Sequence, residues 1–260
     1  MKIGIVGFGT VGQALARFFA RCDEHEVSVY DKYLAPFAGQ RSLDAINAGD
    51  LAFIAVPTPF DPHAGACDVA EVRDAVAHLN VPVCVKSTVP PGTIQAIARE
   101  TGKRVAFSPE YLGESAGHPW READSCGFAI FAGDPLARAL AREAYESTAP
   151  GLRCVETDAG TAELAKYMEN CFLATKIAFA NQFAELAQRA GTDFEAVRSL
   201  FVLDPRIGES HTRVSAEGGF GGRCLPKDIA SIVAWAGGGA NAPLLQAVID
   251  YNDAVRSERV

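Results

Sequence analysis

The sequence lacks the features of several common functional classes. No two of its seven cysteines form a CxxC pair, and none lies near a histidine cluster with zinc-ligand spacing. It also lacks excess positive charge, because the formal net charge of −8 would repel the phosphates of nucleic acid and of anionic lipid. We therefore expect no metal ion, no nucleic-acid partner and no membrane partner.

A long uninterrupted apolar run is also missing. The most apolar helical stretch, residues 171–187, contains Lys176, Asn181 and Glu185, so it is unsuited to cross a bilayer. The N-terminal MKIGIVGFG leads directly into a strand and a glycine turn, and so predicts no signal peptide. An odd, scattered set of cysteines is typical of a reducing compartment. Together these absences predict a cytoplasmic protein.

The first half of the chain alternates short β-branched runs with amphipathic stretches. Strands are expected at 2–7, 27–31, 51–56, 81–87, 104–108 and 128–133, and helices at 10–21, 68–79, 93–101 and 135–148. Strands that are apolar throughout and separated by helices predict a parallel, doubly wound α/β sheet. We expect a Rossmann-like domain over residues 1–157.

The second half reads as helical. Residues 159–190 contain no proline, and no glycine beyond the first turn, which predicts one long helix; further helices are expected at 193–202, 227–236 and 242–256. A helix of some thirty residues is about 45 Å long, more than a small domain needs. We expect an all-helical domain over 158–260, with the long helix also serving as a homodimer interface.

A dinucleotide site is predicted at the first strand. Gly7, Gly9 and Gly12 form GxGxxG directly after that strand and at the start of a helix. The second strand ends on Asp31, where a carboxylate can accept both ribose hydroxyls and would repel a 2′-phosphate. This pattern favours NAD, although Lys32 next to it leaves NADP open.

Two groups of residues in the second half point to chemistry. Lys166 and Asn170 are four residues apart and so lie on one helix face, flanked by apolar residues. Taken alone, such a pair is more often a solvated lysine and an asparagine that align by chance. In GGFGGRCLPKD (218–228), glycines precede Cys224, and Pro226 suits a first helical turn, so Cys224 would lie at the positive end of a helix that stabilises a thiolate.

A nucleophilic thiol together with a nicotinamide suggests a four-electron oxidation. An alcohol is oxidised to an aldehyde, the thiolate attacks it, the thiohemiacetal is oxidised to a thioester, and water releases an acid. This sequence of steps needs two NAD per turnover and a base for the water. The other six cysteines are expected to be small buried hydrophobes.

Seven motifs in order resemble those of the UDP-glucose/GDP-mannose dehydrogenase family, whose members oxidise a primary alcohol of a nucleotide-sugar to a carboxylate. They are GFGTVG at the start, VPTP (56–59), KSTVPPGT (86–93), SPEYLGES (108–115), ELAKYMENCFLATKIAFANQ (163–182), DPRIG (204–208) and GFGGRCLPKD (219–228). The resemblance runs through almost the whole chain.

The resemblance implies a role for each matching residue. Cys224 would be the nucleophile and Lys166 would stabilise the oxyanion, with Asn170 and Asp228 assisting through water, and Thr88 and Glu110 would hold or activate the catalytic water. The implied cofactor residues are Gly7, Thr10, Val11, Gly9, Gly12, Asp31, Val56, Pro57, Thr58, Thr88, Glu114 and Lys227. The implied substrate residues are Glu110, Tyr111, Leu112, Lys166, Asn170, Phe220, Gly221, Cys224 and Arg206, the last of which would reach the substrate of a partner subunit.

Two departures from the family pattern leave the substrate open. Family members continue into a third domain that grips the nucleotide, and we expect this chain to lack it, because the sequence ends at Val260. The segment GESHTRVSAEGGFGG (208–222) also lacks the asparagine-rich or lysine-bearing stretch of the family, and His211 and Arg213 are candidate substitutes. We therefore expect either a UDP-glucose-like nucleotide-sugar or a smaller nucleotide or nucleoside.

Two other functions remain open. The β-hydroxyacid dehydrogenases also join a Rossmann domain to a helical one and carry a lysine and an asparagine four apart, but they perform a single two-electron oxidation without a thiol. The chain could instead be a non-catalytic NAD-binding companion subunit. The glycine-framed Cys224 favours the acid-forming enzyme over both.

Overall fold

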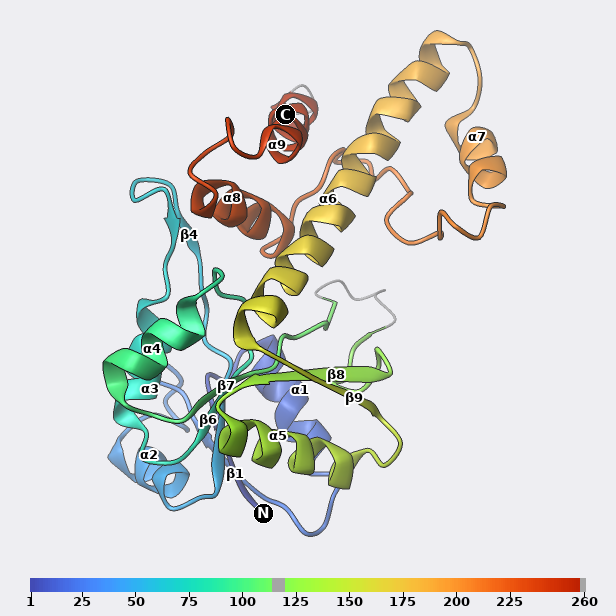
Figure 1. Ribbon diagram of the computed structural model, residues 1–260. Coiled ribbons are helices and arrows are strands. Elements are labelled where there is room, and N and C mark those ends of the chain that lie inside the picture. The colour runs from blue at the N-terminus through green and yellow to red at the C-terminus, as the bar shows by residue number, and fades with distance from the viewer. Residues whose placement is uncertain (114–119, 258–260) are drawn as a thin grey trace. The chain divides into compact units, whose positions relative to one another are not determined.

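The six strands predicted in the first half and one further strand form a seven-stranded sheet in the computed structural model, which describes residues 1–113 and 120–257 (Figure 1). The sheet order is β2-β1-β3-β6-β7-β8-β9. Its strands are Lys2–Val6 (β1), Glu26–Tyr30 (β2), Leu51–Ile54 (β3), Val83–Val85 (β6), Val105–Phe107 (β7), Phe128–Gly133 (β8) and Arg153–Thr157 (β9). A separate two-stranded pair joins Phe60–Asp61 (β4) and Ala66–Cys67 (β5).

The sheet is mostly, but not wholly, parallel. The first five strands of the order pair in parallel, whereas β8 pairs antiparallel with β7, and β9 runs parallel to β8. A parallel return requires a crossover segment, usually a helix, and the described residues between β7 and β8 contain no helix. The doubly wound fold is confirmed, and its last two strands correct the expectation of a uniformly parallel sheet.

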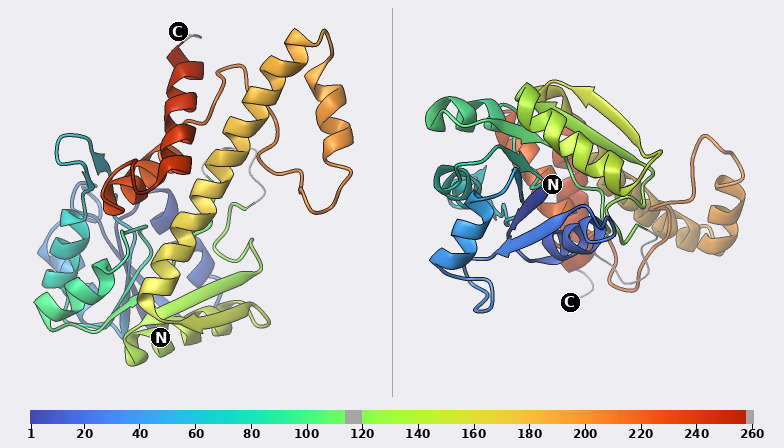
Figure 2. Two further views of the ribbon diagram at one scale, coloured as in Figure 1. Left: turned by 45° about the horizontal axis from the view of Figure 1, so that its top comes forward. Right: turned by 90° about the horizontal axis from the view of Figure 1, so that it is seen from below.

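Helices cover both faces of this sheet. The helices around it are Thr10–Phe19 (α1), Gln40–Asn47 (α2), Ala70–His78 (α3), Thr93–Thr101 (α4) and Pro135–Thr148 (α5). One apolar cluster joins strand residues such as Ile54 and Val85 to α2, α3 and α4, and a second joins Ile5 and Phe53 to α1 and α5. Figures 1 and 2 show α2, α3 and α4 gathered on one side of the sheet.

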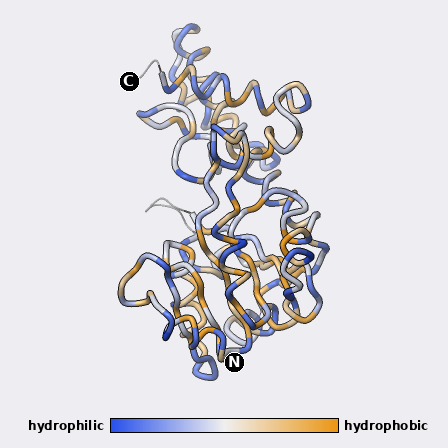
Figure 3. The backbone as a smooth tube through the Cα atoms, turned by 90° about the vertical axis from the view of Figure 1, so that its left-hand side faces the viewer, coloured by the Kyte–Doolittle hydropathy of each residue, from blue (hydrophilic) through white to orange (hydrophobic). Residues whose placement is uncertain are grey.

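Alternation along each strand explains the two clusters. Neighbouring residues point to opposite faces, so Ile5 and Val6 lie in different clusters, as do Phe53 and Ile54. Hydrophobic residues are accordingly concentrated in these strands (Figure 3). Because both faces are buried, β1, β3, β6 and β7 are apolar runs rather than alternating ones.

The second half of the chain is helical, as predicted. Helix α6 (Ala159–Arg189) has 31 residues, which corresponds to about 46 Å. It is followed by Phe194–Phe201 (α7), Leu225–Trp235 (α8) and Pro243–Ser257 (α9). Tyr167 and Ala174 of α6 pack with Ile229 of α8, Val248 of α9 and the loop residue Phe220 in a separate apolar core.

The chain thus has two units, each with its own core. Unit 1 comprises Met1–Asp61 and Cys67–Lys166, and unit 2 comprises Pro62–Ala66 and Tyr167–Val260, so α6 begins in unit 1 and continues in unit 2. Among the described residues, no helix combines the length and the apolar character that a membrane span requires.

Candidate active site

The glycine turn after β1 has the geometry of a dinucleotide cradle. Gly7 has a φ of +89°, a region that favours glycine, and its N–H donates to the Tyr30 carbonyl at 2.9 Å. A Cβ on Gly12 would lie 1.9 Å from the Gly7 carbonyl oxygen, so only glycine lets α1 approach the strand this closely. Around Gly9, by contrast, a Cβ would meet no heavy atom within 4 Å. The open space at Gly9 suits the close approach of a pyrophosphate.

Asp31 lies directly after β2 and is held by three backbone N–H donors. Oδ2 accepts from Phe8 at 2.8 Å, and Oδ1 accepts from Tyr33 at 2.9 Å and from Leu34 at 3.0 Å. Partial burial opposes ionisation of this carboxyl, but the hydrogen bonds outweigh it and lower the pKa of Asp31. The carboxylate is thus ionised and fixed beside the glycine turn.

These residues meet in a cleft at the carboxyl ends of β1, β2 and β3. The cleft has a volume of about 250 Å³, and its lining includes Gly7, Asp31, Val56 and Pro57. The sheet order reverses around β1, and such a switch point is where open α/β sheets bind ligands. Thr10 and Val11 form the first turn of α1 next to it. The residues present therefore fit a dinucleotide.

The far wall of the same cleft is acidic, and this bears on the choice between NAD and NADP. Lys32 pairs with Glu71 at 3.5 Å and with Asp74 at 3.4 Å, and both carboxylates line the cleft. The charge of Lys32 is thus neutralised within the protein. Three carboxylates at one end of the cleft would repel a 2′-phosphate, so the site favours NAD.

The segment 86–92 after β6 is tied to its neighbours on both sides. Thr58 Oγ1 donates to the Thr88 carbonyl at 2.8 Å, and Ser87 Oγ donates to the Val56 carbonyl at 2.6 Å. On the other side, Glu163 of α6 accepts from the N–H groups of Gly92 at 2.6 Å and Ile94 at 2.9 Å. Glu163 is buried and holds the N-terminus of α4, a role that the sequence analysis missed.

Glu110 follows β7 and is held from two directions. Its Oε1 accepts from the backbone N–H groups of Tyr111 at 2.8 Å and Leu112 at 3.2 Å, and its Oε2 lies 3.3 Å from Lys86 Nζ. The buried Lys166 places its Nζ 4.3 Å from the centre of the Tyr111 ring, a cation–π contact. Unit 1 therefore groups Glu110, Tyr111, Leu112 and Lys166, whereas Glu114 lies outside the described residues.

Cys224 is the N-cap residue of α8 in unit 2, and Pro226 lies in the first turn of that helix. The Cys224 carbonyl accepts from the Asp228 N–H at 2.9 Å. Cys224 is exposed, whereas the other six cysteines are buried or partly buried. Burial, and after it the charge of Asp228, raises the pKa of Cys171 to about 12. The exposed thiol at the positive end of a helix is thus chemically distinct from a buried one.

A polar network lies behind Cys224. Asn170 Nδ2 donates to Asp228 Oδ2 at 2.5 Å, and Lys227 Nζ pairs with Asp228 Oδ1. Asp228 is only 1% exposed, and such a buried carboxylate needs these partners. Unit 2 therefore brings together Asn170, Asp228, Lys227 and Cys224.

The glycine loop before Cys224 is anchored by three side chains that the sequence analysis did not assign. Asn181 Oδ1 of α6 accepts from the Gly219 N–H at 3.0 Å, and Asn252 Oδ1 of α9 accepts from the Phe220 N–H at 2.6 Å. Arg256 lies against Gly221, where a Cβ would be 2.9 Å from Nη1. Both asparagines are buried in otherwise apolar helix faces. A buried polar residue in such a face is the signal that could have found them.

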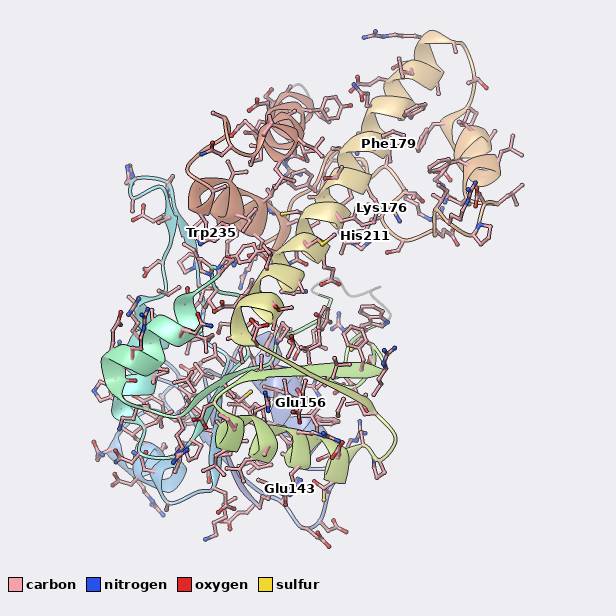
Figure 4. All side chains as sticks on the ribbon, viewed as in Figure 1. Glu143, Glu156, Lys176, Phe179, His211 and Trp235 are labelled. Atoms are coloured by element: carbon pink, nitrogen blue, oxygen red, sulfur yellow. The ribbon has the colours of Figure 1, made fainter. Side chains whose placement is uncertain are left out.

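The segment that carries Arg206 follows α7. Arg206 is 86% exposed and pairs with Asp204, while Lys176 of α6 donates to the carbonyls of Ile207 and Gly208, both at 3.2 Å. Figure 4 shows Lys176 on α6 and His211 on the loop after α7. Arg213 pairs with Glu195 and Glu209 on the surface of this loop. Lys176 thus holds the loop that presents Arg206.

Comparisons with known proteins agree with this geometry. Residues 37–119 match the model of the UDP-glucose/GDP-mannose dehydrogenase family, NAD binding domain, and residues 160–254 match that of the family's central domain. The chain is 32% identical to the UDP-glucose 6-dehydrogenase TuaD of Bacillus subtilis, over 98% of this chain and 63% of the relative. It is also 32% identical to the UDP-glucose 6-dehydrogenase AglM of Haloferax volcanii, over 97% of this chain and 70% of the relative.

A solved structure of a dehydrogenase is also similar to this chain. A UDP-glucose dehydrogenase from Pyrobaculum islandicum superposes with a TM-score of 0.79 at 29% identity, over 99% of this chain and 68% of that chain. The chain spans 63% and 52% of the length of the first two curated relatives that it matches. Both halves of the chain, with the dinucleotide cleft in one and the glycine-framed cysteine in the other, match in order. The chain belongs to the UDP-glucose/GDP-mannose dehydrogenase family.

Proposed function

We propose that the protein catalyses the NAD-dependent four-electron oxidation of a primary alcohol of a nucleotide-sugar to a carboxylate. The observation that carries this proposal is Cys224, an exposed cysteine at the N-cap position of α8. It follows a glycine loop and precedes Lys227 and Asp228, which pair with each other, and Asp228 also accepts from Asn170. A thiol is needed only if the reaction passes through a thioester, because a two-electron oxidation forms no acyl group. NAD would supply the hydride acceptor, one molecule for each of the two oxidations.

Cys224 acts after the first oxidation. Its sulfur forms a bond to the aldehyde carbon, and the carbonyl oxygen takes up the negative charge as a thiohemiacetal forms. The Lys166 cation stabilises this oxygen, which is how a fixed positive charge lowers the barrier to an oxyanion. Asn170 and Asp228 hold the water that assists proton transfer.

Hydrolysis completes the reaction after the second oxidation. Water adds to the thioester carbon, the C–S bond breaks, and Cys224 leaves as a thiolate while the acid is released. Glu110 accepts the proton of the attacking water, and Thr88 helps to hold that water. Glu110 is suited to this role because its Oε1 is already fixed by two N–H groups.

Two kinds of substrate are proposed, and both carry the primary alcohol that the reaction oxidises. The relatives named UDP-glucose 6-dehydrogenase motivate UDP-glucose as the first candidate, and a smaller nucleotide or nucleoside that carries a primary alcohol is the second. Tyr111, Leu112, Phe220 and Gly221 would contact it. The two-electron oxidation and the non-catalytic companion subunit are the remaining alternatives.

We further propose a homodimer along α6. Large apolar side chains are exposed on unit 2, including Phe172, Phe179 and Phe183 of α6. Together with Phe201 of α7 they line a cavity of about 470 Å³ between these helices. A continuous exposed aromatic face of this kind is typical of an interface. The exposed Arg206 also lines this cavity, and from there it would reach the substrate of the partner subunit.

Counting NADH against substrate tests the proposal. The full chain is incubated with NAD and a panel of nucleotide-sugars and nucleosides that includes UDP-glucose. Two NADH per substrate consumed, with release of an acid, is the expected result. One NADH would favour the two-electron dehydrogenase, and NAD binding without turnover would favour the companion subunit.

Variants of two cysteines sharpen this test. Cys224→Ser is expected to lower acid formation by more than about 10³-fold, since an enzyme that loses its covalent nucleophile retains only its binding and electrostatic contributions. Cys22→Ser, which changes a partly buried cysteine of unit 1, serves as the matched control and should retain activity. An undiminished rate of acid release by Cys224→Ser would refute the thioester route.

A further inference from the structure

A buried lysine lies next to the proposed base and has no part in the chemistry described above. Lys86 follows β6 directly, and its side chain is 3% exposed. Its Nζ donates to Ser108 Oγ at 3.1 Å and to Tyr145 OH at 3.0 Å, and lies 3.3 Å from Glu110 Oε2. The ammonium thus has two hydrogen-bond acceptors, Ser108 and Tyr145, and one ion-pair partner, the Glu110 carboxylate.

The partners of Lys86 come from different elements of unit 1. Ser108 and Glu110 follow β7, the strand beside β6, whereas Tyr145 lies on α5. Both strands run parallel, so their carboxyl ends meet at the same edge of the sheet. Lys86 therefore joins the segment that carries Glu110 to a helix that packs on one face of the sheet.

Tyr145 is fixed by aromatic packing. It is 1% exposed, and its ring lies 4.9 Å from Phe18, 5.4 Å from Phe19 and 5.3 Å from Phe131, measured between ring centroids. A tyrosine that is enclosed on several sides keeps its hydroxyl at one point in space. That hydroxyl is the fixed end of the chain Tyr145–Lys86–Glu110.

The charge of Lys86 also suits it to hold the Glu110 carboxylate. Burial disfavours the Lys86 cation, but Glu110, Tyr145 and Cys84 together outweigh this effect, and the pKa of Lys86 lies above its ordinary value. Lys86 is therefore a cation near neutral pH. Its charge and its geometry suit the positioning of a carboxylate.

We propose that Lys86 and Tyr145 are positioning residues that hold the Glu110 carboxylate in the orientation required to accept the proton of the hydrolytic water. This inference rests on the proposed function, in which Glu110 is the base for thioester hydrolysis. In that step the water oxygen bonds to the acyl carbon, the C–S bond to Cys224 breaks, and the proton passes to Glu110. Neither Lys86 nor Tyr145 touches the reacting atoms.

The decisive variant is Tyr145→Phe, which keeps the ring and removes only the hydroxyl. A misplaced base slows hydrolysis but leaves both oxidations intact, so we expect a rapid burst of two NADH per site followed by a steady-state rate about tenfold lower. The KM for the nucleotide-sugar should fall together with the steady-state rate, so that kcat/KM remains unchanged, because the thioester accumulates before hydrolysis. Glu110→Gln should give the same burst with a loss of about 10²-fold or more, and adding Tyr145→Phe to it should cause no further loss.

Tyr251→Phe is the matched control, because Tyr251 OH donates to Glu185 at 2.8 Å in unit 2. It should show neither the burst nor the slower steady state. An undiminished steady-state rate in Tyr145→Phe would overturn the proposal, as would an equal loss in the first NADH and in the steady state. A further loss of rate when Tyr145→Phe is added to Glu110→Gln would also overturn it.

A crystal structure of Tyr145→Phe separates this inference from the proposed function. If no member of the substrate panel is oxidised, the proposed function fails, and the positions of the side chains alone decide the inference. A Glu110 carboxylate that leaves Lys86 in the variant supports the positioning role. A carboxylate that keeps its place and its contact with Lys86 overturns it.

Discussion

Replacing Gly12 by alanine tests the cofactor cradle directly. The new Cβ would lie 1.9 Å from the Gly7 carbonyl oxygen, and an ordinary contact begins near 3.4 Å, so the two must separate by 1.5 Å. The Gly7 carbonyl cannot move freely, because the Gly7 N–H is bonded to Tyr30 and a Cβ at Gly7 would itself meet the Ala55 backbone at 2.7 Å. Overpacking of this kind costs about 3 kcal/mol. For a unit of this size that corresponds to a fall in Tm of about 6–12 °C.

Gly9, in the same turn, provides the matched control for Gly12→Ala. Gly9→Ala introduces the same methyl group where a Cβ meets nothing within 4 Å and where the φ is −72°, which alanine adopts readily. We therefore expect Gly9→Ala to keep its Tm within about 2 °C of the parent and to weaken NAD binding, whereas Gly12→Ala loses both stability and NAD binding. Differential scanning calorimetry and calorimetric titration with NAD measure the two effects. A Gly12→Ala protein with an unchanged Tm would refute the steric argument.

Two further predictions concern charge and assembly. The folded-state pKa of Asp31 lies below the unfolded value of about 3.9, so its hydrogen bonds stabilise the fold above that pH, and this contribution is lost as the pH falls through the folded pKa. Asp31→Asn should therefore lower stability at pH 7 by about 1 kcal/mol and flatten the dependence of Tm on pH below about 4; an unaltered profile would contradict this. Phe183→Glu, at a position that is 41% exposed, should convert the dimer into a monomer in sedimentation experiments without loss of helix content. A parent protein that sediments as a monomer would refute the interface.

Most elements were predictable because their apolar patterns are strong. The bounds of α4 and α5 agree with the predicted ranges, and those of α6 differ by one residue at the C-terminal end. Strand β9 was not predictable in this way, because it is an edge strand whose residues are largely exposed, so RCVET carries no continuous apolar run. Helix α2 was not predictable either, since it buries only Ile46. Elements that bury little leave little signal in the sequence.

The residues of the candidate site also fall into two groups, those that the sequence could predict and those that it could not. Gly7, Gly12, Asp31 and Cys224 could be found because each local motif imposes a backbone requirement that the sequence displays. The partners of Asn181, Asn252 and Glu163 could not be predicted, since each side chain accepts from a segment that is far away along the chain. Their importance follows only from where their carbonyl and carboxylate oxygens lie.

The sequence by itself determined most of the strands and helices, the dinucleotide turn, the acid after β2, and the cysteine at the start of α8. These features follow from local rules: side-chain periodicity, glycine conformations and helix capping act over a few residues. The tertiary structure alone decided the direction of β8, the anchors of the glycine loop, and the contact of Lys86 with Tyr145 and Glu110. Lys86 and Tyr145 are 59 residues apart in the chain, and no local pattern can record that packing brings their polar atoms within 3.0 Å.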